Sequence, residues 1–162
     1  MTSKRRVFKP QQPSSAPGGV AGEAIGTEAF RRLGLVNDRA ELVKQIHRGF
    51  RVAVIGKLAD ELCLPQQTLL KVTKIAPATL TRRRKSASGL LSPEESDRVY
   101  RIAAAYRSAL QLFEGEAESA RRWLNEPAKA LGNNSPLQHL DTEAGAAEVR
   151  DLIGRLEHGI YT

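Results

Sequence analysis

The stretch QQTLLKVTKIAPATLTRRRKS, residues 66–86, decides the fold, because it contains two short helical patterns separated by a tight turn. The first pattern covers about residues 65–74 and the second about 77–86. Ile75 is expected to pack in the angle between the two helices, and Leu80 is expected to attach the second helix to the core. This arrangement is that of a helix-turn-helix, whose second helix enters the major groove of DNA.

An inward-facing Leu80 fixes the outward face of the second helix, since successive residues are 100° apart. That face has suitable chemistry, because arginine pairs with guanine, and threonine and alanine contact a thymine methyl or a phosphate. Arg83 and Arg84 lie nearer the core side, and their long stems would reach phosphates. A solvated basic helix is the simpler alternative, and Lys74 stands where many such turns have glycine. The predicted DNA-binding residues are Ala78, Thr79, Thr81, Arg82, Arg83, Arg84 and Lys85.

Helical patterns continue on both sides of this motif. Asn37 is predicted to cap a helix over about 38–49, and another helix is expected near 51–63. Ser92-Pro93-Glu94-Glu95 has the signature of a capping box, and it predicts a long helix that ends near Glu114. No strand pattern of any length is present, so the sequence predicts an all-α fold. Shorter helices are expected over about 116–125, after Pro127, after Ser135, and from Thr142 to Gly159.

Composition supports this class. The 162 residues are 41% hydrophobic but only 5% aromatic, which favours helices over a β-sandwich. Residues 1–26 are rich in proline, glycine and serine and are expected to form a disordered tail. Cys63 is the one cysteine, which excludes an internal disulfide, and we expect a buried, inert thiol. No apolar run approaches the roughly 20 residues of a membrane span, and no secretory signal is evident, so we expect a soluble cytoplasmic protein.

The net charge of +7 is unevenly distributed. Residues 1–113 contain 20 basic and 9 acidic side chains, whereas residues 114–162 contain 5 basic and 9 acidic ones. A basic part indicates attraction to nucleic acid, and an acidic part indicates a second task, unless the division arose by chance.

Enzymatic chemistry is poorly supported. The three histidines, His47, His139 and His158, have no metal-binding spacing, and no metal site or cofactor is expected. Glu94 and Glu95 are adjacent, so they face different sides of a helix and suit capping better than acid–base catalysis.

The C-terminal part resembles a known family. Residues 122–162, RWLNEPAKALGNNSPLQHLDTEAGAAEVRDLIGRLEHGIYT, are similar to the C-terminal domain of Xre/MbcA/ParS-type antitoxins. The middle, IAPATLTRRRK followed by LSPEESDRVYRIA, resembles the Xre-like DNA-binding part of the same family. The matching C-terminal features are Trp123-Leu124, Pro127, Ala130-Leu131-Gly132, Ser135-Pro136-Leu137, Leu140, Gly145, Ala146, Val149, Leu152 and Glu157-His158-Gly159.

This resemblance implies a type II antitoxin that sterically blocks a RES-domain toxin expected to destroy NAD, and that represses its own operon by binding operator DNA. The expected domains are a disordered tail (1–26), a helix-turn-helix domain (27–113) and a small toxin-binding domain (114–162). A homodimer is expected, because palindromic operators match two-fold symmetric proteins. The alternative is a stand-alone helix-turn-helix regulator whose C-terminal module only dimerises.

The toxin contact is expected on the last helix, where small and charged residues lie opposite Val149. Small residues allow close docking, and charged residues could pair with polar groups of a cleft built for a dinucleotide. Trp123 is either an interface residue or a core residue, and Ile160 and Tyr161 either dock or fold back onto it. The predicted toxin-binding residues are Trp123, Leu140, Ala147, Arg150, Asp151, Gly154, Arg155, Glu157, His158, Ile160 and Tyr161.

The predicted capping box can be tested by the substitution Ser92→Ala. We expect a loss of roughly 0.5–2 kcal/mol in the free energy of unfolding, with DNA and toxin binding retained. Thermal melts measure the change, and a melting temperature equal to that of the wild type would exclude the cap.

Overall fold

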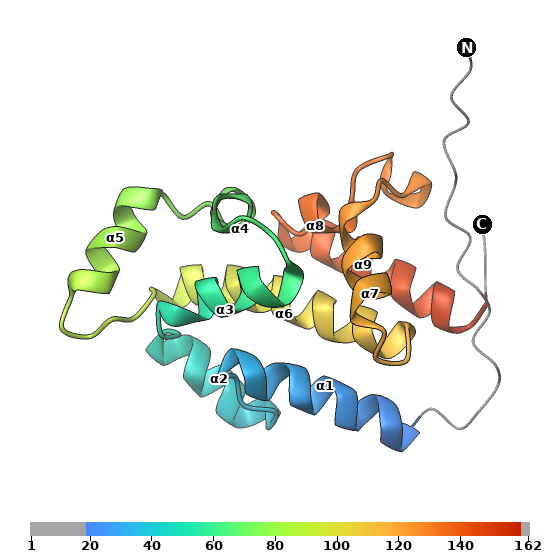
Figure 1. Ribbon diagram of the computed structural model, residues 1–162, viewed down its shortest axis with the longest axis horizontal. Helices are drawn as coiled ribbons and strands as arrows, with labels where there is room; N and C mark the ends of the chain where they lie inside the picture. The colour runs from blue at the N-terminus through green and yellow to red at the C-terminus, as the bar shows by residue number, and fades with distance from the viewer. Residues whose placement is uncertain (1–18, 160–162) are drawn as a thin grey trace, which may run out of the picture.

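The structure is a computed structural model that describes residues 19–159, and it arranges them around one long helix, α6 (Figure 1). Within that range the only β pairing is an isolated antiparallel bridge between Arg51 and Leu90, so the predicted all-α class is confirmed. The elements are α1 (Gly19–Leu33), α2 (Arg39–Arg48), α3 (Ala53–Leu62), α4 (Gln66–Thr73), α5 (Pro77–Lys85), α6 (Pro93–Leu112), α7 (Ala117–Asn125), the 3-10 turn η1 (Lys129–Leu131), α8 (Pro136–His139) and α9 (Glu143–Glu157).

The start of α6 is the predicted capping box. The backbone N–H of Glu95 donates to Ser92 Oγ over 3.1 Å, and the N–H of Ser92 donates to Glu95 Oε2 over 2.7 Å. Pro93 occupies the first turn, where the absence of an N–H costs nothing. These local bonds fix where the longest helix of the described chain begins.

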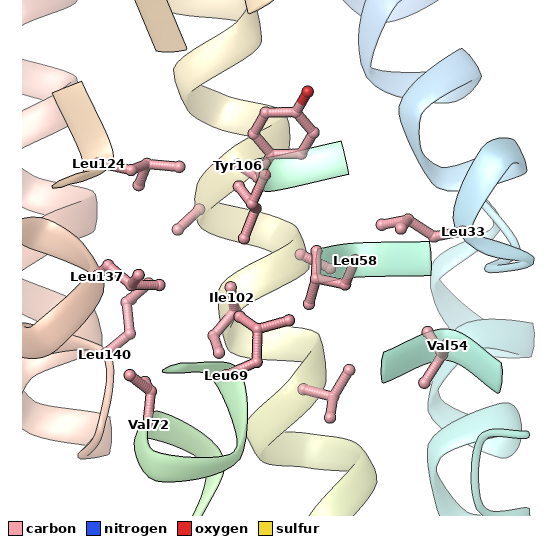
Figure 2. Close-up of a cluster of buried hydrophobic side chains, with 14 of the residues drawn as sticks. Leu33, Val54, Leu58, Leu69, Val72, Ile102, Tyr106, Leu124, Leu137 and Leu140 are labelled. Carbon is pink, nitrogen blue, oxygen red and sulfur yellow. The ribbon is translucent and has the colours of Figure 1, made fainter. Parts of the chain in front are cut away.

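Both halves of the chain share one hydrophobic core built on α6. Figure 2 shows Ile102 and Tyr106 of α6 at its centre, with Leu33 of α1 on one side and Leu137 of α8 on the other. Ile102 and Tyr106 are fully buried. The C-terminal module therefore packs directly on the helix that supports the helix-turn-helix.

A polar cluster around Glu61 also joins four helices. Its carboxylate accepts a hydrogen bond from the Tyr106 hydroxyl over 3.3 Å and lies 3.4 Å from Arg32 Nε of α1. Its backbone carbonyl accepts from Arg121 Nε of α7. Burial, and then the charge of Glu61, raise the pKa of Tyr106, so its hydroxyl stays protonated and able to donate at neutral pH.

The expected disordered tail is wrong for residues 19–26, because α1 begins at Gly19. Phe30 of α1 is fully buried, and Arg107 of α6 lies over its ring, 4.2 Å from the centroid. Further upstream, Gln111 Nε2 donates to the carbonyl of Gly22 over 3.1 Å. Contact with α6 thus supports a helix in a segment with a loop-like composition. Residues 1–18 lie outside the described range.

Two further expectations are corrected. Cys63 is exposed, because it is the C-cap of α3 with φ of 52° and points away from the apolar face. Asp38, and not Asn37, caps α2, since its side chain accepts from the N–H of Glu41 over 2.8 Å.

The start of α9 depends on a glycine. A Cβ at Gly145 would lie 1.9 Å from the carbonyl oxygen of His139, whereas one at Gly154 on the same helix would meet nothing within 4 Å. We therefore expect Gly145→Ala to lower the free energy of unfolding by about 1–3 kcal/mol, because backbone must move.

Gly154→Ala is the matched control, and it should raise helix stability by up to about 1 kcal/mol. Urea denaturation measures both variants. Equal stability of the two would contradict the close approach of α8 and α9.

Candidate functional site

The helix α5 is formed by local signals at both of its ends. Pro77 fits the first turn, and the last turn carries four basic side chains near the negative end of the helix dipole, where cations are stabilising. Leu80 is the buried residue of α5, as predicted.

The turn before α5 has the predicted geometry. Lys74 takes the left-handed conformation with φ of 55°, and its N–H bonds to the carbonyls at the end of α4. Such a conformation costs a non-glycine residue roughly 1–2 kcal/mol. Ile75 is only 3% exposed in the angle between the helices, and its burial offsets that cost.

The outward face of α5 is the one predicted. Thr79 is half-buried at the side of this face. The helix is about 13 Å long, a size that fits the major groove. Four predicted residues are exposed and, with Ser86, line one shallow hollow: Ala78, Thr81, Arg82 and Lys85.

Arg83 and Arg84 are directed toward the protein itself. Arg83 Nη2 lies 3.4 Å from Glu95 Oε2 at the start of α6. Arg84 Nη2 donates to Gln66 Oε1 of α4 over 3.3 Å. In this structure both guanidiniums have partners within the protein, and Arg84 is also exposed to solvent.

Two basic residues beside α5 were not predicted. Lys71 and Lys74 line a second hollow next to the turn, with the apolar side chain of Ile75 at its floor. Lys71 lies in the last turn of α4, and its place in the sequence directly before the turn is the signal that could have indicated it. Lys74 Nζ also lies 3.6 Å from Asp141 Oδ2 of the C-terminal module.

The second candidate surface is on α9. Thr142 caps this helix by accepting from the N–H of Gly145 over 3.1 Å, and Val149 is fully buried, as predicted. The opposite face is open: Asp151 and His158 are exposed, and Ala147 and Gly154 are partly exposed.

Charged residues surround this face. Arg150 Nη2 donates to Glu143 Oε1 over 3.0 Å, whereas Asp151 and Glu157 are exposed and form no ion pair with a residue in the range 19–159. Arg155 is half-buried, and its Nε has no hydrogen-bond partner among the described residues. The face thus offers two free carboxylates beside small side chains.

The other predicted toxin-binding residues do not join this face. Trp123 is 8% exposed and Leu140 is 2% exposed, so both belong to the core. The core interpretation of Trp123 is therefore confirmed. Ile160 and Tyr161 lie outside the described residues. Figure 1 shows α5 at one end of the molecule and the last turns of α9 toward the other.

None of the helices between residues 19 and 159 is long and apolar enough to cross a bilayer. The same range contains no group of three or more histidine, cysteine, aspartate or glutamate residues placed to hold a metal ion.

Two family models match the chain. Residues 41–104 match the antitoxin Xre-like helix-turn-helix domain, and residues 108–159 match the antitoxin Xre/MbcA/ParS C-terminal toxin-binding domain. The boundary between the two matches falls within α6, the helix that both halves share.

Curated relatives match across both halves. An Antitoxin Xre from Yersinia enterocolitica is 42% identical over 134 residues, which are 82% of this chain and 90% of the relative. An Antitoxin Xre from Photorhabdus laumondii is 33% identical over 72% of this chain and 78% of its own length. A Prs ADP-ribosylating antitoxin from Sphingobium is 24% identical over 76% of this chain and 80% of its own length.

The exposed face of α5 yields a direct test. Arg82→Ala is expected to weaken binding to DNA from the chain's own promoter by about 1–3 kcal/mol, because one base contact is lost. Arg31→Ala removes the same charge from an exposed site on α1 and serves as the control. Gel-shift titrations at fixed salt measure both, and equal affinities would exclude Arg82 from the interface.

Proposed function

The chain belongs to the Xre antitoxin family, and from that premise we propose that it is a type II antitoxin which sterically blocks a RES-domain, NAD-degrading toxin. The observation that supports this best is the pair of open surfaces on one shared core, a basic one on α5 and one of small and acidic residues on α9. A single chain with both surfaces can bind DNA and a protein together.

The DNA-binding half would repress the chain's own operon. Arg82 and Thr81 on α5 would contact bases, while Lys71 and Lys74 beside it supply cations for the phosphate backbone. A homodimer would present two such helices to a palindromic operator. This role requires a cytoplasmic location, where the operator DNA is.

The α9 half would occupy the toxin's active site without chemistry of its own. A face with Ala147 and Gly154 lets a partner's surface approach closely, and Asp151 and Glu157 can pair with basic groups that normally bind a phosphate-rich dinucleotide. The proposed role is therefore non-catalytic inhibition.

The toxin's chemistry needs its own test. One relative is named for ADP-ribosylation, a reaction that transfers ADP-ribose from NAD to a protein. Expression of the neighbouring gene product without the antitoxin should deplete cellular NAD if the toxin hydrolyses it. Transfer also consumes NAD, so the product separates the two reactions: free ADP-ribose indicates hydrolysis, and ADP-ribosylated protein would assign the partner to the transferase class.

Neutralisation can be tested at Gly154, where a Cβ atom would meet nothing within 4 Å. Gly154→Trp should leave the chain folded and still able to bind promoter DNA. It should fail to protect cells that express the toxin, because the indole fills the space that the partner needs. Survival of toxin-expressing cells is the measurement.

Gly56→Trp is the matched control, since Gly56 is also in a helix, α3, and also has open space around its Cβ position. It should protect cells as the wild type does. Full protection by a folded Gly154→Trp variant would exclude this part of α9 as the inhibitory surface. Failure of the wild type to co-purify with the neighbouring gene product would favour a stand-alone regulator.

A further inference from the structure

The recognition helix α5 has a small apolar attachment. Leu80 is its one buried side chain, and α5 lies at the end of the molecule, apart from the helices packed along α6 (Figure 1). A helix held by a single buried residue can tilt and rotate about that point. The hydrogen bond from Arg84 to Gln66 is exposed to solvent and supplies little restraint, so the orientation of the outward face needs a second constraint.

Arg83 provides that constraint. It follows Leu80 by three residues, so the two side chains lie on neighbouring parts of one face, about one turn apart. Its Nη2 lies 3.4 Å from Glu95 Oε2. The Arg83 side chain is 34% exposed and that of Glu95 is 11% exposed, so solvent screens this pair less than a surface ion pair.

Glu95 is itself held in place. The Oε2 atom that faces Arg83 also accepts the N–H of Ser92 over 2.7 Å, within the capping box. The next residue, Ser96, is fully buried and accepts the N–H of Phe50 through its hydroxyl over 2.8 Å. The carboxylate is thus a fixed point on the core.

We propose that Glu95 and Arg83 form a positioning pair that sets the orientation of α5 for operator recognition, with Arg83 acting on Glu95 and not on a DNA phosphate. Two attachments one turn apart fix the tilt and rotation of the helix. They thereby determine where Thr81 and Arg82 meet the bases. The inference rests on the proposed DNA-binding role.

The phosphate interpretation predicts an effect of opposite sign. If Arg83 contacted a phosphate, the carboxylate of Glu95 would compete with the DNA for it. Removal of that negative charge would then strengthen DNA binding. In the positioning interpretation, the same removal weakens operator binding, although the protein becomes more positive.

Glu95→Gln separates these cases, because glutamine also completes a capping box while the charge is lost. We expect its affinity for the chain's own promoter DNA to fall roughly tenfold, because a reoriented α5 would place Thr81 and Arg82 out of line with the bases. Its affinity for random duplex DNA should stay equal or rise. Asp97→Asn removes the same charge two residues later, from a half-exposed side chain that pairs with Arg101 of α6 and not with α5, and it should bind the promoter as the wild type does.

Arg83→Ala leaves the capping box untouched and tests the other partner. It should show a similar loss, and the double variant with Glu95→Gln should show no further loss, because both changes break one interaction. The slope of log affinity against log salt should not change, whereas loss of a phosphate contact lowers it by about 1. Urea denaturation confirms that each variant is folded.

Several results would overturn the inference. These are promoter binding by Glu95→Gln at or above the wild-type level, additive losses in the double variant, or a reduced salt slope for Arg83→Ala. Failure of the proposed function looks different, because the wild type itself would then show no preference for promoter DNA. If Arg82→Ala lowers the affinity for promoter DNA and Glu95→Gln does not, the positioning pair alone is refuted.

Discussion

Burial of α6 on two sides is the constraint on which the rest of this structure depends. The helix is 20 residues long, roughly 30 Å, and its buried positions extend from Glu95 to Leu110. Helices α1, α3 and α4 pack against it, and so do α7 and α9 of the C-terminal module. Loss of packing along α6 would therefore affect both functional surfaces.

Polar contacts then fix how the outer elements sit on this core. The cluster at Glu61 joins α1, α3, α6 and α7, and Arg101 of α6 reaches Glu143 at the start of α9 over 3.1 Å. The pair of Lys74 with Asp141 joins the helix-turn-helix turn to the loop before α9. Contacts of this kind contribute modest energy, but they restrict the orientation of elements that bury few apolar groups.

The two open surfaces differ in how they are built. On α5, one buried leucine, one ion pair and one exposed hydrogen bond to α4 leave most of the helix free for a polyanion. On α9, the buried face is broad, with Val149, Leu152 and Ile153 in the core, so that the opposite face is held firmly. A firmly held face of small side chains suits a rigid protein partner, because little conformational entropy is lost when the two surfaces bind.

The sequence by itself determined what depends on neighbours along the chain. The capping box at Ser92, the cap at Thr142, the turn before Pro77 and the outward face of α5 follow from short-range hydrogen bonds and helical periodicity. The resemblance also indicated the family. The tertiary structure alone decided the helix over 19–26, the exposure of Cys63, the burial of Trp123 and the partner of Arg83. Each of these depends on how separate elements pack: α6 supports α1, the core encloses Trp123, and Glu95 meets Arg83 only because the loop after α5 brings the start of α6 close to that side chain.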